Sequence, residues 1–384
     1  MDFDLQWMLL GLPVAFGIGW LASRLDLRQG RRERHDSPRA YFKGLNLLLN
    51  EQHDKAIDSF IEAVQQDPDT SELHFALGSL FRRRGEYERA VRVHEHLMSR
   101  ADLSRGDRDR AQHALAQDFM KAGIFDRAEA AWHALEGTAF DTEARLALLT
   151  LHERSRNWRA AVEVANKLER SGTGSYASRI AHYWCELALE ADARQAPDEA
   201  DEAVSRARAA APLAARPLLL SGQRARLRGD HVGALRDWGS LMVSDPAVFC
   251  LVAVEYAESA RAIDQSDTAL TSLIKLSKLE PGLQLLSAIA LIDGNVEHQR
   301  ARLREQLQRH PSLSSARALL QLEVPSPDDA GDRGLIDQAL AQSARPLQRY
   351  RCAACGFEAQ HYFWQCPGCL SWDSYPPKML EDLG

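Results

Sequence analysis

Catalytic signatures are absent from this 384-residue sequence. It has no Walker loop for nucleotide phosphates and no Gly-x-Ser-x-Gly elbow for a serine hydrolase. The His-Glu pairs at His94 and His152 lack the second histidine that a zinc protease needs four residues after the first. Two loose Gly-x-Gly-x-x-Ala matches, at residues 17 and 172, follow no predicted strand and indicate no dinucleotide site. We therefore expect no enzyme, and we interpret the thirteen histidines as surface or satisfied residues.

Excess positive charge is missing and cysteine is scarce. The formal net charge is -7, which gives no indication of a nucleic-acid-binding protein. Of six cysteines, only Cys185 and Cys250 lie outside one C-terminal cluster, each in an apolar helical context. We interpret both as buried free thiols. Because nothing resembles a secreted disulfide framework, a reducing compartment is expected.

One long run lacks charge altogether, the eighteen residues from Leu5 to Ala22. As a helix it would span about 27 Å, close to the hydrocarbon core of a bilayer. Trp7 and Trp20 lie near its two ends, where interfacial aromatic residues are common. The run predicts a single transmembrane helix; an amphipathic or buried helix is the alternative.

The flanking charges predict the orientation of this helix. Two aspartates precede the run and five arginines follow it: Asp2 and Asp4, then Arg24, Arg28, Arg31, Arg32 and Arg34. By the positive-inside rule the N-terminus faces out and the bulk of the chain is cytoplasmic. A secretory signal peptide would have its basic residues before the apolar run. We place a transmembrane anchor at residues 1–25 and a basic juxtamembrane linker at 26–36.

The middle of the chain, residues 37–322, repeats with a period near 34 residues. The segment "YFKGLNLLLNEQHDKAIDSFIEAVQQDP" aligns with "LHFALGSLFRRRGEYERAVRVHEHLMSR". Alanine recurs at one phase, and an apolar or aromatic residue often follows it four positions later. The alanines are Ala56, Ala90, Ala128, Ala161, Ala200, Ala234 and Ala269; the later residues include Phe60, Trp132, Trp238 and Leu273.

This period resembles the tetratricopeptide (TPR) repeat, a helix–turn–helix unit. A small residue lets two antiparallel helices approach closely, and a glycine before the second helix suits a helix C-cap and turn. We count about eight units, starting near residues 37, 71, 109, 142, 181, 215, 250 and 280. A non-repetitive helical bundle is the alternative. The resemblance implies a superhelix whose concave groove binds a peptide or another protein.

A linker with one short helix, residues 323–348, leads to a cysteine-rich tail, residues 349–384. Two Cys-x-x-Cys pairs stand there ten residues apart, and each can form a tight knuckle. We predict that Cys352, Cys355, Cys366 and Cys369 bind one metal ion in a tetrahedral four-thiolate site. Such a site accepts zinc or iron. A redox dithiol pair is the rival interpretation, but no βαβ context surrounds it.

Aromatic residues are concentrated around these cysteines. The ten-residue link can form a small hairpin, and Pro367 and Gly368 suit the turn of the second pair. Aromatic side chains are expected to cover the site, because a module this small has little other core: Phe357, Tyr362, Phe363, Trp364 and Trp372. The metal would then supply much of the folding free energy. Residues 349–373 carry no net charge, so nucleic-acid binding is not expected.

The expected fold class is all-α: a TPR superhelix of about eight repeats after one N-terminal transmembrane helix, with a small C-terminal rubredoxin-like or zinc-ribbon domain. This order resembles the bacterial lipopolysaccharide assembly protein B (LapB) family. The resemblance rests on the anchor with its arginine run, the repeats, and "YRCAACGF" with "FWQCPGCLSW".

The family resemblance implies a function that composition and spacing do not give. It implies a bacterial inner-membrane adaptor that acts with the FtsH protease to limit the deacetylase LpxC, and that couples lipopolysaccharide synthesis to lipopolysaccharide transport proteins. It also implies that the metal-binding tail packs against the repeats and is needed for function. Our own hypothesis is that the tail caps the array and helps fix its curvature. The anchor and repeats permit a homodimer. A generic membrane-anchored TPR scaffold and a rubredoxin-type electron-transfer partner are the alternatives.

Overall fold

The computed structural model describes residues 42–50, 52–67, 70–323 and 330–382, together with Phe16 and Trp20. The chain divides into two compact units, Met1–Leu151 and His152–Gly384. Apart from Phe16 and Trp20, the predicted anchor and basic linker lie outside the described residues, so the membrane span stays a prediction. Across the described ranges, no helix combines the length and the apolarity that crossing a bilayer requires.

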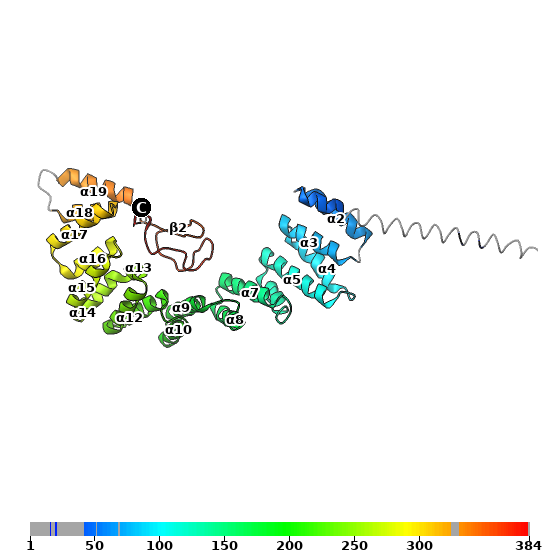
Figure 1. The fold of residues 1–384 in the computed structure, drawn as a ribbon, viewed down its shortest axis with the longest axis horizontal. Helices are drawn as coiled ribbons and strands as arrows, with labels where there is room; N and C mark the ends of the chain where they lie inside the picture. Colours follow the sequence, from blue (N-terminus) through cyan, green and yellow to red (C-terminus); the bar gives the residue numbers. More distant parts are fainter. Residues whose placement is uncertain are drawn as a thin grey trace, which may run out of the picture. The chain divides into compact units, whose positions relative to one another are not determined.

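The first unit consists of helices joined by short turns (Figure 1). Residues 42–49 are helical, and the helices that follow are α2 (His53–Gln66), α3 (Ser71–Arg84), α4 (Tyr87–Ser99), α5 (Arg105–Ala122) and α6 (Phe125–His133). Helix α7 (Asp141–Ser155) begins in this unit and ends in the second. Helices that are consecutive in sequence pack on one another, α3 on α4 and α4 on α5.

The second unit continues the same arrangement and ends in a small module, residues 349–382, which we call the ribbon. Its helices are α8 (Trp158–Arg170), α9 (Ala177–Ala193), α10 (Pro197–Ala210), α11 (Ala215–Leu227), α12 (His231–Ser244), α13 (Pro246–Phe249), η1 (Cys250–Val252), α14 (Ala253–Ala262), α15 (Ser266–Ser277), α16 (Leu283–Asp293), α17 (Val296–Arg309), α18 (Leu313–Leu322) and α19 (Ala330–Ala344). The ribbon contains β1 (Tyr350–Arg351), β2 (Glu358–Ala359) and η2 (Leu380–Asp382).

The seven alanines predicted to lie at helix–helix contacts are all buried. Ala269 is 2% exposed, and the other six of that phase are 0% exposed. The side chains predicted four residues later are buried with them: Trp132 is 3% exposed, Phe60 is 1% exposed, and Trp238 and Leu273 are 0% exposed. Burying one face of each helix against its neighbours supplies the core that a single helix pair could not. The prediction of a mostly helical, TPR-like repeat region is therefore confirmed for the described residues.

Two glycines show how closely the paired helices approach. A Cβ atom added at Gly78 of α3 would lie 2.4 Å from the His94 ring of α4. One added at Gly222 of α11 would lie 2.3 Å from Nε1 of Trp238 in α12. In both repeats the missing side chain makes room for a ring from the partner helix. Gly85 is the helix C-cap that was predicted before the second helix of a repeat. Its φ of 83° lies in the left-handed region and ends α3.

The last repeats depart from the regular pattern. The first helix of the seventh repeat starts at Pro246 and is broken into α13, η1 and α14, because Val252 (φ -124°, ψ 13°) leaves the helical region. Beyond α17, helices α18 and α19 pack as a further pair. The Arg317–Asp337 ion pair (2.9 Å between Nε and Oδ1) joins them. The short helix expected in the linker is thus packed against the array.

Candidate metal centre and its docking surface

The first cysteine pair lies in a turn that a short strand pair closes. The backbone N–H of Cys352 donates to the carbonyl of Phe357, and the N–H of Gly356 donates to the carbonyl of Cys352, both at 2.9 Å. Strands β1 and β2 pair antiparallel on either side of this turn. Gly356 has a φ of 78°, which a glycine adopts without strain.

The second cysteine pair lies in a turn with the same two backbone hydrogen bonds. The N–H of Cys366 donates to the carbonyl of Ser371 (2.9 Å), and the N–H of Leu370 donates to the carbonyl of Cys366 (2.8 Å). An antiparallel bridge between Gln365 and Trp372 closes it. Leu370, with a φ of 62°, occupies the left-handed position that Gly356 takes in the first turn. Two equivalent knuckles therefore present their sulfurs to each other.

The small hairpin that the sequence allowed for the ten-residue link does not form, because the ends of the link are used to close the two knuckles. Gly368 lies in the turn of the second pair, as expected. A Cβ atom there would lie 3.2 Å from the Phe357 ring, so the glycine serves the close approach of the two knuckles.

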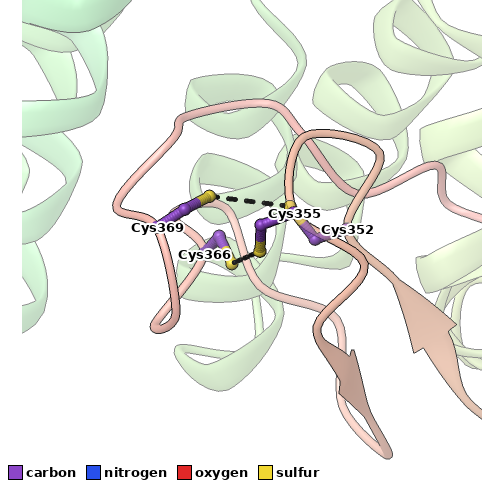
Figure 2. A group of neighbouring side chains, drawn as sticks. All are labelled: Cys352, Cys355, Cys366 and Cys369. Atoms are coloured by element: carbon purple, nitrogen blue, oxygen red, sulfur yellow. Dashed lines mark hydrogen bonds between the residues drawn. The ribbon is translucent and has the colours of Figure 1, made fainter. Parts of the chain in front are cut away.

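The four predicted ligand sulfurs are brought together (Figure 2). All four Sγ atoms lie within 4.8 Å of one another. Cys352 Sγ lies 3.8 Å from Cys369 Sγ, and Cys355 Sγ lies 3.6 Å from Cys366 Sγ. A tetrahedral ion with metal–sulfur bonds of about 2.3 Å would give sulfur–sulfur edges of about 3.8 Å. The cysteines are free thiols rather than disulfides, and their spacing fits one ion between them.

The electrostatics of the cluster also fit a cation. Burial disfavours the Cys352 thiolate, but the Ser374 hydroxyl and nearby backbone amides outweigh it and lower its pKa to about 6. The Ser371 hydroxyl and amide lower the pKa of Cys369. At Cys355 the Phe357 amide favours the thiolate, yet desolvation and the neighbouring sulfurs raise its pKa to about 12. The sulfurs cannot all carry charge side by side without a cation to neutralise them.

The aromatic residues were expected to cover the site together, but they divide among three environments. Tyr362 packs on the buried cluster of Tyr350, Cys352, Cys366 and Tyr375. Phe357 and Phe363 are 44% and 38% exposed. Trp364 and Trp372 face the repeat helices instead. The expectation was wrong for Trp364 and Trp372, which pack on the repeats, whereas Phe357 lies against Gly368 of the second knuckle and Phe363 against Tyr375.

Trp372 makes the most connected contact between the ribbon and the repeats. Its ring stacks on His182 of α9, with centroids 4.7 Å apart and an interplanar angle of 20°. It meets the rings of Trp158 and Tyr183 edge-on. Its Nε1–H donates to Oε1 of Glu153 at 2.8 Å. The expected docking of the tail on the repeats is therefore present in the second unit.

Glu153 is an acceptor shared by three donors. Besides Trp372, the Arg179 guanidinium (2.7 Å) and the Tyr183 hydroxyl (2.5 Å) donate to the same Oε1 atom. Glu153 is only 6% exposed, so each donor compensates part of the cost of burying its carboxylate. Burial and this charge raise the pKa of Tyr183. The ribbon thus completes a buried hydrogen-bond network.

A second polar contact lies next to the first. Asp373 Oδ2 lies 2.9 Å from Nε2 of His182, and the Ser178 hydroxyl donates to the same oxygen at 3.4 Å. The Arg216 guanidinium of α11 lies 5.7 Å from the centre of the Trp364 ring and 5.8 Å from that of Trp372. These contacts hold the inner face of the ribbon on α9 and α11.

The end of the ribbon is fixed to later helices. Lys378 Nζ lies 2.9 Å from Glu280 Oε2, just beyond α15. Glu381 accepts hydrogen bonds from the backbone N–H (2.7 Å) and the hydroxyl (2.5 Å) of Ser314, in the first turn of α18. A carboxylate at a helix N-terminus satisfies an orphan donor and is stabilised by the helix dipole. The ribbon therefore contacts α7, α9, α11 and α18 in the second unit.

Sequence reasoning did not identify Glu153, His182, Arg216 or Tyr375 as parts of this site. In the sequence, Glu153 is part of the incomplete protease motif at His152. His182 is one of the thirteen histidines interpreted as surface or satisfied residues. His182 is 3% exposed, within an apolar run where a polar residue needs a partner. Of the two remaining cysteines, Cys185 is buried as expected, whereas Cys250 is only partly buried beside the ribbon.

Two family models match separate parts of the chain. The family model described as "Rubredoxin metal binding domain" matches residues 350–376, and the tetratricopeptide repeat model matches residues 73–111. Among solved structures, a tetratricopeptide repeat protein from Parabacteroides merdae is 15% identical, covers 67% of this chain and 98% of its own, and has a TM-score of 0.33.

Two curated relatives match nearly the whole length. Lipopolysaccharide assembly protein B of Escherichia coli K12 is 30% identical over 97% of this chain and 98% of its own. The protein of the same name from Haemophilus influenzae is 28% identical over the same shares of the two chains. With its repeats and its four-cysteine ribbon in the same order, the chain belongs to the lipopolysaccharide assembly protein B family.

Proposed function

We propose that the protein is a non-enzymatic adaptor in lipopolysaccharide biosynthesis, built from a repeat array and a metal-loaded ribbon. The observation that carries the proposal is the interlocking of these two parts in the second unit. Trp372 and Asp373 of the ribbon join Glu153 and His182 of the repeats. A surface held together in this way suits the binding of other proteins, and the family name points to lipopolysaccharide assembly.

In this proposal one zinc or iron ion is held by Cys352, Cys355, Cys366 and Cys369. Four protein ligands fill a tetrahedral site, so the ion would supply structural stability rather than an open coordination position for catalysis. The chain's own contribution is to orient the sulfurs. Ser371 and Ser374 hydroxyls lie 3.3 Å from Cys369 Sγ and Cys352 Sγ, and they stabilise thiolate charge there.

The partners in this proposal are the FtsH protease and the deacetylase LpxC, which the adaptor would present for degradation, with lipopolysaccharide transport proteins as further partners. The proposed location is the inner membrane, with residues 1–25 as the anchor and the repeats on the cytoplasmic side. Both proposals rest on the family resemblance and on the charge pattern of the N-terminal segment.

A pull-down tests the adaptor function. Full-length tagged protein is extracted in detergent from cells, and co-purifying proteins are identified by mass spectrometry. The test variant is Trp372→Ala, which removes the docking ring but none of the four cysteines. The control is His361→Ala, which changes an exposed ribbon residue.

We expect FtsH and LpxC with the unchanged protein and with His361→Ala, and their loss with Trp372→Ala. Absence of both from the unchanged protein would reject the proposed partners. Retention by Trp372→Ala would show that ribbon docking is not needed for partner binding. Cells depleted of the protein should also accumulate LpxC, measured by immunoblot.

A further inference from the structure

A charged pocket lies between α10 and α11, away from the residues that hold the ribbon. It encloses about 290 Å³. Three arginines and two serines form most of its wall, and its lining residues are Asp201, Val204, Ser205, Arg208, Ser221, Arg224 and Arg228. We call it the arginine pocket. The proposed adaptor function does not use it.

Arg224 is the fixed base of the arginine pocket. It is 7% exposed, and its guanidinium donates to the carboxylates of Asp192 and Asp201 and to the carbonyl of Pro197. Burial disfavours the Asp201 carboxylate, but its hydrogen bonds with Arg224 and Arg228 outweigh that and hold its pKa below the usual value. Asp201 therefore stays ionised at neutral pH and keeps both guanidinium groups in place.

The other two arginines keep unused donors. Arg208 uses Nη1 for Asp237 (3.1 Å) and for the Ser221 hydroxyl (3.4 Å). Arg228 uses Nη1 for Asp201 and Nε for the carbonyl of Arg224. A guanidinium has five N–H donors in a planar fork, so each of these two arginines retains donors beyond those bonds. Their side chains are 39% and 52% exposed, which leaves them accessible to a ligand.

The groups that line the arginine pocket are mostly positive, whereas two of the carboxylates that pair with its arginines lie outside the lining. Three guanidinium groups line the pocket, but only one carboxylate, that of Asp201, lines it with them. Asp192 and Asp237 hold Arg224 and Arg208 without lining the pocket. A wall with two more positive than negative charges, braced by carboxylates outside it, favours a small anion.

We propose that the arginine pocket binds a phosphate group, held by the free donors of Arg208 and Arg228 over the fixed guanidinium of Arg224. A guanidinium group donates two parallel hydrogen bonds. This geometry suits two oxygens of one phosphate better than it suits a spherical anion such as chloride. The Ser205 hydroxyl on the same wall can donate a further hydrogen bond. The volume admits a diphosphate or a phosphate with a small substituent, so the phosphate can belong to a soluble anion or to a lipid headgroup.

Calorimetric titration of the full-length protein in a neutral detergent tests this proposal. One arm uses inorganic pyrophosphate and the other uses dihexanoyl phosphatidic acid, a soluble short-chain lipid, both at about 50 mM salt to limit screening. The test variants are Arg208→Gln and Arg228→Gln, which are partly exposed and leave Arg224 with both its aspartates. The matched control is Arg206→Gln on the same helix, whose guanidinium pairs with Glu202 and lies over the Trp184 ring.

We expect saturable one-to-one binding of at least one probe. Both test variants should weaken it about tenfold or more, whereas Arg206→Gln should change it less than twofold, although all three remove one positive charge. Binding of pyrophosphate alone identifies a soluble ligand, and binding of the lipid alone identifies a headgroup. No saturable binding of either probe up to about 10 mM, or equal weakening by all three variants, would overturn the proposal.

Discussion

Trp372 Nε1 donates a 2.8 Å hydrogen bond to Glu153 Oε1, although 219 positions separate the two residues in sequence. This bond crosses from the knuckle that carries Cys366 and Cys369 to the end of α7. Glu153 is buried and already accepts from Arg179 and Tyr183. The ribbon therefore adds a donor to a carboxylate in the repeats, and the two parts should stabilise each other.

Trp372→Phe should weaken docking while the cysteine cluster stays intact. Phenylalanine keeps a ring over His182 but loses the Nε1–H donor, so the buried Glu153 carboxylate accepts one hydrogen bond fewer. Losing a bond to a buried charged group costs about 1–3 kcal/mol. Urea unfolding of the full-length protein measures this loss, and hydrogen exchange of residues 349–382 should become faster.

A double-mutant cycle with Glu153→Ala, which removes the acceptor, separates this contact from general damage. If the bond carries the effect, the coupling energy between the two substitutions should be about 1 kcal/mol or more. Additive effects would mean that Trp372 acts through its ring contacts instead. Phe363→Leu, on the exposed face of the ribbon, should leave both measurements nearly unchanged.

Removing one ligand sulfur should release the metal and loosen the ribbon. Cys366 is 0% exposed, and its Sγ lies 3.6 Å from Cys355 Sγ. Cys366→Ser therefore removes a buried sulfur from the four that would bind the ion. Elemental analysis should fall from one ion per chain to well below half, and the ribbon should become sensitive to protease. Cys250→Ser is the control, because its thiol lies outside the cluster. Equal metal content in all three proteins would contradict the assigned ligands.

The repeat period and the cysteine spacing were readable from the sequence because each follows from local geometry. The contact alanines, such as Ala90 and Ala234, recur because a small residue is required wherever two helices meet, and all are buried. The four cysteines converge because each pair needs only one turn of backbone. Local rules therefore predicted both the fold class and the clustering of the sulfurs.

The docking surface could not be predicted in the same way because it depends on contacts distant in sequence. Neither Glu153 nor His182 stands out in its own helix, and their partners lie about 200 residues later. Leu370 shows a further limit. It takes a left-handed conformation that sequence rules assign to glycine, and the knuckle imposes this conformation through the hydrogen bond to Cys366.

A methyl group added between two paired helices should be far more costly than one added outside them. Gly222→Ala would bring Cβ within 2.3 Å of Trp238 Nε1, and this fully buried ring has little room to move. Overpacking of this kind costs about 1–3 kcal/mol. Gly239→Ala in α12 is the matched control, because its Cβ would meet nothing within 4 Å. It should be neutral or stabilise by up to about 1 kcal/mol, since alanine favours helix.

Thermal and urea unfolding followed by circular dichroism distinguish the two alanine variants. Gly222→Ala should lower the midpoint, while Gly239→Ala should leave it unchanged or raise it. If both variants shifted the midpoint downward by the same amount, the close approach of α11 and α12 would not explain the glycine at position 222.

Raising the pH above about 9 should lower the free energy of unfolding, and ionisation of Cys185 in the unfolded chain should cause part of this loss. Burial raises the pKa of this thiol from 9.0 to about 12. The native state therefore keeps a proton that the unfolded chain loses above pH 9, so the stability it contributes is complete below that pH and disappears as the pH rises towards 12. Between these limits one such group lowers the unfolding free energy by about 1.4 kcal/mol per pH unit.

Comparing Cys185→Ala with the unchanged protein by urea unfolding at several values between about pH 8 and 11 isolates this group. Alanine removes the titrating thiol, so the variant should lose stability less steeply above pH 9, by up to one proton's contribution to the slope. The small cavity left by the substitution shifts the whole curve equally at every pH and does not alter its slope. Parallel curves for the two proteins would show that Cys185 keeps an ordinary pKa despite its burial.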